Sequence, residues 1–157
     1  MATYTDTLGF NKGSAALPSN ALHKVHLVEM TLDFPAIIAA RSAAGATALA
    51  ASDVMEIIPI PAGTLVSNVG MVVTTAAGVT STISIGDGSA AAGYLAATSA
   101  NATGTSGGVP VLSSGAFAPT LSGGKLYSAA DTIDITLGTA VPAAAVVRIF
   151  ALLTDIN

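Results

Sequence analysis

Cysteine is absent from the 157-residue sequence, and so is tryptophan. Without thiols the chain forms no disulfide, offers no thiolate nucleophile and binds no metal through sulfur. We therefore expect packing, or association with other chains, to stabilise the fold.

Charged side chains are scarce as well. Asp, Glu, Lys and Arg make up 9% of the residues, compared with about 25% in an average soluble domain. A surface with so few charges leaves small apolar and hydroxyl side chains exposed in an isolated chain, which favours burial against other subunits. The sequence has five Lys and Arg residues and a net charge of −4, so we expect no direct binding to nucleic acid.

An export signal and a membrane-spanning run are also missing from the sequence. The first residues contain neither the basic nor the apolar stretch of a secretory signal peptide. The most apolar window, residues 36–51, is interrupted by Arg41 and Gly45 and is shorter than the roughly 20 apolar residues of a spanning helix. We expect a soluble protein that is made without an export signal and does not enter a membrane.

What the sequence does contain is a series of short β-rich segments separated by turn residues. The best-defined stretch is 57–88, in which Pro59, Pro61 and Gly63 mark a turn and Gly86-Asp87-Gly88 ends a later strand. Strands are expected over residues 26–34, 52–58, 64–75, 79–85, 109–112, 125–127, 132–137 and 144–154.

Seven or eight short strands without a long helix predict an all-β fold, a single β-sandwich. The expected core within the stretch 57–88 consists of Ile57, Leu65, Val69, Val72, Ile83 and Ile85. The last strand is apolar on both faces except at Arg148, which places it either centrally in a sheet or at a subunit interface.

Two internal segments lack a clear period. Residues 36–51 are rich in Ala and predict either a loop or a short helix, with Asp33 near its cap, Pro35 in its first turn and Gly45 at its end. Residues 89–108 are rich in Ala, Gly, Ser and Thr and predict a long loop, with or without one short strand inside it.

The chain is expected to consist of an extended N-terminal arm, residues 1–20, and a β-sandwich domain, residues 21–157. The arm has isolated apolar residues and neither a strand nor a helix period. It is either a frayed terminus or a segment that becomes ordered on a neighbouring subunit. In the second case the expected contact residues are Tyr4, Leu8, Phe10 and Leu17.

Three short motifs suggest chemistry but lack the surroundings that the chemistry needs. Residues 104–108 match G-x-S-x-G, yet both histidines precede the motif and no helix is expected after it. His23 and His26 would face opposite sides of a strand. Asp87 lacks the other oxygen ligands of a calcium loop and is better explained as a turn residue that accepts backbone hydrogen bonds. We expect no catalytic residue, metal site, cofactor or small-molecule substrate.

Several segments resemble those of phage structural proteins. They include IPAGTLV at 60–66, SIGDG at 84–88 and YSAADTIDI at 127–135, followed by a hydrophobic C-terminal strand. With these segments the chain resembles small structural proteins of tailed double-stranded DNA bacteriophages, and within that group the head decoration, or cement, proteins.

The resemblance implies a jelly-roll-like sandwich that forms a homotrimer, binds the major capsid protein on the outer surface of the phage head and stabilises the shell without enzymatic activity. It also implies a location in the virion, after assembly in the host cytoplasm. Two other functions stay open. One is a phage tail or fibre component that binds the host surface through residues 89–108. The other is a glycan-active enzyme, although no carboxylate pair of the kind it needs is evident in the sequence.

Overall fold

The computed structural model describes residues 3–4, 25–107 and 124–156. In chain order the elements are β1 (Thr3–Tyr4), β2 (Val25–Asp33), α1 (Phe34–Ala43), β3 (Val54–Ile60), β4 (Thr64–Thr75), β5 (Thr82–Asp87), β6 (Ala90–Ser99), β7 (Gly104–Gly107), β8 (Lys125–Tyr127), β9 (Asp131–Leu137) and β10 (Val146–Asp155). The predicted strand 109–112 lies outside the described residues.

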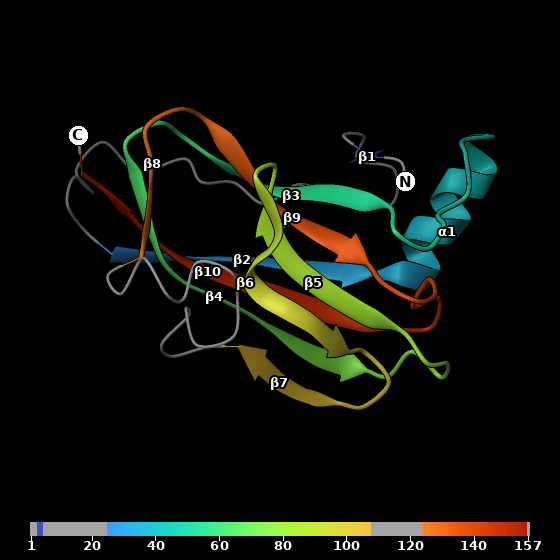
Figure 1. Ribbon diagram of the computed structural model, residues 1–157. Coiled ribbons are helices and arrows are strands. Elements are labelled where there is room, and N and C mark those ends of the chain that lie inside the picture. Colours follow the sequence, from blue (N-terminus) through green and yellow to red (C-terminus); the bar gives the residue numbers. More distant parts are fainter. Residues whose placement is uncertain (1–2, 5–24, 108–123, 157) are drawn as a thin grey trace.

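Two five-stranded sheets pack face to face (Figure 1). Sheet A has the order β1-β3-β9-β5-β6, and sheet B has the order β2-β10-β4-β7, with β8 also paired to β4. The β1–β3 pair is parallel and the other pairs are antiparallel. The orders 2-10-4-7 and 3-9-5-6 are those of a jelly roll, in which most consecutive strands lie in opposite sheets. The expected all-β, jelly-roll-like sandwich is confirmed.

The last strand, β10, is central in sheet B, one of the two positions that its sequence leaves open. It pairs with β2 on one side and with β4 on the other. One face of β10 is fully buried between the sheets and consists of Val147, Ile149, Ala151 and Leu153. On the other face Phe150 and Leu152 are only partly buried. This second apolar face is the outer face of sheet B.

The prediction of the core is wrong for two of its six residues. Four of the six expected residues are fully buried: Ile57, Val69, Ile83 and Ile85. Leu65 and Val72 are instead partly buried on the outer face of sheet B. The ladder between β4 and β10 contains an extra residue, Ser67, on the β4 side. An extra residue reverses the alternation of faces along a strand, so Val66 and Val69 both face the core.

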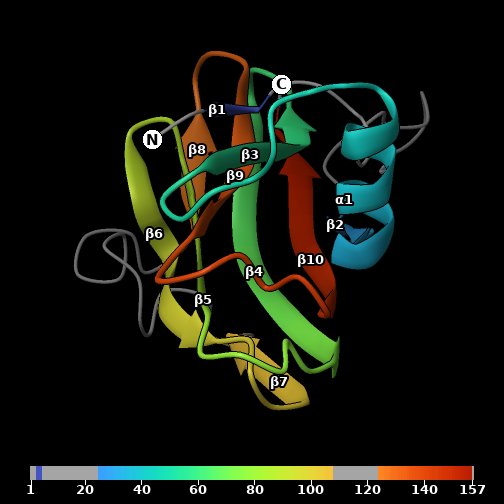
Figure 2. The ribbon, with the colours of Figure 1, turned by 90° about the vertical axis from the view of Figure 1, so that its right-hand side faces the viewer.

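The Ala-rich segment begins as the short helix α1, which lies at one end of the sandwich beside β2 (Figure 2). Asp33 caps it, because its Oδ1 accepts a hydrogen bond from the N–H of Ala36 at 3.0 Å. Pro35 lies in the first turn, and Gly45 follows the helix with a φ of 64°, a conformation that favours glycine. In the part of the chain that the structure describes, no helix has the length and apolar character needed to cross a membrane.

The expected long loop over residues 89–108 is wrong. Strands β6 and β7 occupy most of this region and leave a short turn between them. Strand β6 pairs with β5 and buries Tyr94 and Leu95 in the core, although two register shifts interrupt the ladder. Ala and Gly have low strand propensity, so the pairing with β5 and β4, rather than local preference, makes these residues strands.

Candidate functional site

Asp87 lies where β5 ends and the turn to β6 begins, and its carboxylate is fully buried. Its Oδ1 accepts hydrogen bonds from the N–H groups of Ser89 and Ala90, at 2.9 and 3.0 Å, and from the Ser89 hydroxyl at 2.7 Å. The prediction that Asp87 is a turn residue that accepts backbone hydrogen bonds is confirmed.

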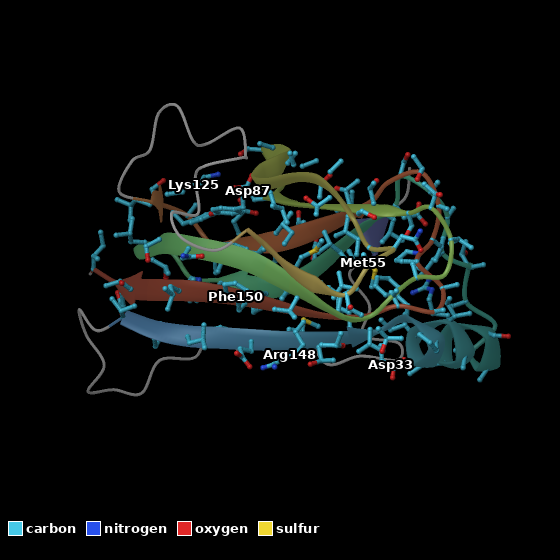
Figure 3. The ribbon with its side chains drawn as sticks, turned by 90° about the horizontal axis from the view of Figure 1, so that it is seen from below. Asp33, Met55, Asp87, Lys125, Arg148 and Phe150 are labelled. Carbon is cyan, nitrogen blue, oxygen red and sulfur yellow. The ribbon has the colours of Figure 1, made fainter. Side chains whose placement is uncertain are left out.

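The other oxygen, Oδ2, is bound by two residues of β8. Lys125 forms an ion pair with it, and the Tyr127 hydroxyl donates a hydrogen bond at 2.7 Å. The Tyr127 hydroxyl also lies 2.6 Å from the hydroxyl of Tyr94 on β6. Strand β8 belongs to sheet B, whereas β5 and β6 belong to sheet A. The network therefore ties the two sheets together, toward the end of the sandwich away from α1 (Figure 3).

This network sets the ionisation of its members. Burial by itself raises the pKa of Asp87, but the hydrogen bonds from Lys125, Tyr127 and Ser89 outweigh burial and lower the pKa to about 2. Burial raises the pKa of Tyr94 and of Tyr127 well above the usual tyrosine value, and the negative charge of Asp87 adds to both shifts. Both hydroxyls are therefore protonated at neutral pH and act as hydrogen-bond partners rather than as proton acceptors for a substrate.

A pocket of about 280 Å³ lies next to the network. Glu56 of β3, Asp131 and Asp134 of β9, and Asp87 line it, and we call it the acidic pocket. Glu56 and Asp134 are directly opposite each other in the antiparallel β3–β9 pair. Sequence reasoning missed this group, because the two strands that carry it are far apart in the chain and become neighbours only in the folded sheet.

Asp134 is the most perturbed carboxyl of the acidic pocket. It is 5% exposed, and its Oδ1 accepts a hydrogen bond from the Thr132 hydroxyl at 2.6 Å. Burial raises its pKa to about 6, and the negative charges of Glu56, Asp131 and Asp87 contribute to the shift. The pKa of Asp134 therefore lies closer to neutral pH than that of an ordinary aspartate. Among the described residues, no group of three or more Asp, Glu, His or Cys side chains is arranged to hold a metal ion.

A larger cavity, of about 490 Å³, lies between α1, the segment that follows it and the loop before β10. Its lining is mostly apolar and includes Leu49 and Val141. Arg41 of α1 is 4% exposed and lies in its wall, where Nε donates a hydrogen bond to the carbonyl of Thr47 at 2.9 Å. This bond holds the segment after α1 against the helix, so Arg41 has a structural role.

No protein-family model matches the sequence, and no curated protein matches it significantly. Among solved structures, the chain is similar to a chain in the capsid of Ralstonia phage GP4, with a TM-score of 0.54. The alignment covers 90% of this chain and 90% of that chain, at 12% sequence identity. The two chains share a fold. At this identity the likeness does not extend to individual residues.

Of the four contact residues predicted in the N-terminal arm, the structure describes only Tyr4. It belongs to β1, where its backbone pairs in parallel with Met55 of β3. Leu8, Phe10 and Leu17 lie outside the described residues. The contact role of the arm therefore stays a prediction.

Of the histidine motif the structure describes His26, which does not line the acidic pocket. Residues Gly104–Gly107 form β7, in which Ser106 pairs with Met71 of β4, and a strand here differs from the strand-turn-helix that presents a nucleophilic serine. His26 lies on β2 opposite Leu153, and its ring nitrogens have no hydrogen-bond partner among the residues described. His23 lies outside the described residues.

Proposed function

We propose that this protein is a structural protein of a bacteriophage virion and, within the virion, a capsid decoration or cement protein. It binds the outer surface of the head as a homotrimer, contacts the major capsid protein and stabilises the shell against the pressure of the packaged DNA. The observation that carries the proposal is the jelly-roll fold, which is similar over 90% of both chains to a chain in the capsid of Ralstonia phage GP4.

The surface chemistry supports an assembly role. Few residues are charged, and the large apolar side chains of Val25, Leu27 and Leu126 are more than half exposed. Contacts of this kind are individually weak, but a trimer that binds a shell through three subunits sums them, which raises the overall affinity.

The buried polar groups support a structural rather than an enzymatic role. In the Asp87 network both carboxylate oxygens are occupied by hydrogen bonds or by the ion pair with Lys125. Asp134 is almost completely buried, so a substrate would reach it only after the pocket rearranged. A glycan-active enzyme would use the acidic pocket, and polysaccharide turnover abolished by Asp134→Asn would support that activity instead.

The test compares phage particles assembled with and without this protein. We expect particles without it to release DNA at a lower temperature and more readily after osmotic shock, and we expect purified protein added afterwards to restore stability. Equal stability of the two kinds of particle would contradict the bracing role.

Electron microscopy of the same particles tests the location. Density on the outer surface of the head, at threefold and quasi-threefold positions, supports a decoration protein, and density confined to the tail or fibres supports a host-binding module instead. The structure weakens the case for that second function, because most of residues 89–108, its expected binding loop, form strands β6 and β7.

A further inference from the structure

We propose that the outer face of sheet B is the surface through which copies of this chain contact one another. The face consists of the outward side chains of β2, β10, β4 and β8. The number of copies, three, rests on the function proposed above, but the choice of surface rests on the chemistry of the face itself.

The face is apolar at the end where β2 begins. One row of paired residues crosses four strands: Val25 of β2, Thr154 of β10, Leu65 of β4 and Leu126 of β8. In the next row Leu27 pairs with Leu152. The two rows are mostly apolar, with Thr154 in the first row and the buried Asn68 of β4, which pairs with Leu152, in the second.

Most of the exposed large hydrophobic side chains gather here. Among the described residues there are five of them, and four lie on β2, on β8 or just after β10: Val25, Leu27, Leu126 and Ile156. The fifth, Val79, lies between β4 and β5. Scattered exposed apolar residues are ordinary on protein surfaces, whereas a contiguous group marks an interaction site.

The centre of the face carries an ion pair. Arg148 of β10 contacts Glu29 of β2 at 2.5 Å, and both side chains are about half exposed; Figure 3 shows Arg148 and Phe150 along β10. Sheet A instead presents the acidic pocket with Glu56 and Asp134. Among the described residues the outer face of sheet B carries two acids, Glu29 and the exposed Asp33, beside one base, Arg148, so its net charge is −1 against −4 for the whole chain, and it repels a second copy less than the acidic sides do.

The same pair of charges indicates that the partner is a second copy of this chain. Around a threefold axis each copy offers Glu29 to one neighbour and Arg148 to the other. The face is therefore complementary to itself in charge as well as in apolar character. An unrelated partner would need its own matched acid and base at the same spacing.

The length and width of the face set the area that such a contact buries. Strands β2 and β10 have 9 and 10 residues, which at about 3.3 Å per residue makes the face roughly 30 Å long, and strands about 4.8 Å apart make it roughly 15–20 Å wide. The footprint is thus on the order of 500 Å² per copy. In a trimer each face is shared between two neighbours, so each pairwise contact buries on the order of 500 Å² and the three contacts together on the order of 1,500 Å².

Leu27→Lys tests the surface, with Val79→Lys as its matched control, because the two side chains are 53% and 49% exposed. Light scattering coupled to size-exclusion chromatography measures the mass. We expect wild type and Val79→Lys to have three times the mass of one 15.3 kDa chain and Leu27→Lys to have the mass of one chain, a threefold drop. Circular dichroism checks that each variant is folded. A folded Leu27→Lys variant that keeps the wild-type mass overturns the inference.

The charge pair supplies a second test. In Arg148→Glu the central pair becomes two acids, and we expect the assembly to dissociate at a protein concentration at least tenfold higher than wild type. Exchanging the charges, with Glu29→Arg and Arg148→Glu together, should restore association. If the exchange leaves the chains dissociated, Glu29 and Arg148 do not pair between copies.

Binding to phage particles that lack the protein separates this inference from the proposed function. A wild-type trimer that dissociates on Leu27→Lys but does not bind particles overturns the function and supports the interface. If the wild-type chain is a monomer and binds particles, and the Leu27→Lys variant does not bind them, the inference is overturned. The partner of this face is then the shell.

Discussion

Lys125 and Asp87 form a buried ion pair that connects β8 of sheet B with the end of β5 in sheet A. The two residues are 38 positions apart in the chain. Arg148 and Glu29 form the same kind of pair on the exposed face of sheet B. Because their surroundings differ, the two pairs are expected to contribute differently to stability.

Replacing Lys125 by Met should lower the free energy of unfolding by about 3 kcal/mol, because it leaves a buried carboxylate without its cation. The matched control is Arg148→Met in the Leu27→Lys background, in which the chains are expected to be separate; there it breaks a pair that is about half exposed on both sides and should cost less than about 1 kcal/mol. Urea denaturation of the two variants measures the difference. Equal losses of unfolding free energy would mean that burial of an ion pair does not increase its contribution to stability.

Acid should remove the contribution of the ionised Asp87 carboxylate to the free energy of unfolding. Its pKa is about 2 in the folded protein, against an ordinary value of 3.8. The folded state binds this proton less tightly than the unfolded state, so the carboxylate adds stability above pH 3.8 that is lost as the pH falls toward 2, about 2 kcal/mol in all. The stability difference between wild type and Asp87→Asn, measured by urea denaturation, should shrink from pH 5 to pH 2. A difference that is constant over this range would contradict the depressed pKa.

Ionisation of Asp134 should lower the stability of the fold, whereas ionisation of Asp87 raises it. Its pKa is about 6 in the folded protein, above the ordinary 3.8, so the folded state binds the proton more tightly and stability falls as the pH rises from about 4 to 6. Asp134→Asn should therefore raise the free energy of unfolding by about 3 kcal/mol at pH 7.5 and have little effect at pH 4. Glu56→Gln removes a neighbouring negative charge and should lower the pKa of Asp134, which NMR titration measures. No gain from Asp134→Asn at pH 7.5 would show that the ionised carboxyl is well solvated.

Tyr94 and Tyr127 should resist ionisation in alkali. Burial and the charge of Asp87 raise the pKa of both, so absorbance at 295 nm should report their ionisation only after unfolding. Stability should fall as the pH rises above about 10, because the unfolded chain releases these protons first. Tyr94→Phe and Tyr127→Phe should each leave one late-ionising tyrosine. Three tyrosines ionising together below pH 11 in the folded protein would exclude the buried network.

Gly86→Ala should disrupt the β5–β6 hairpin, because a Cβ at this position would overlap the backbone of Ala90 and Ala91. Relief of such an overlap requires the strands to shift, and we expect a loss of about 3 kcal/mol or more. Gly88→Ala is the matched control, since its Cβ would lie in ordinary contact with Asp131, 3.6 Å from Oδ1. Thermal unfolding followed by circular dichroism compares the two. Similar melting temperatures would argue against the close approach at Gly86.

Local features of the fold follow from the sequence alone. The alternation along β10 predicted its two apolar faces and limited its position to the centre of a sheet or a subunit interface, because side chains in a strand alternate between the faces of the sheet. Asp33, Pro35 and Gly45 marked the two ends of α1, although a loop stayed open as the alternative, and Asp87 was correctly predicted as a turn residue. The helix cap and the turn depend on interactions within a few residues.

Only the tertiary structure decided which strands are neighbours, and the candidate sites depend on that. The pairing of β3 with β9 places Glu56 opposite Asp134, and the approach of β8 to β5 joins Lys125 to Asp87. The extra residue Ser67 turned Leu65 from the expected core to the outer face of sheet B. Such contacts arise when segments far apart in the chain meet, and local residue preferences do not encode which segments those are.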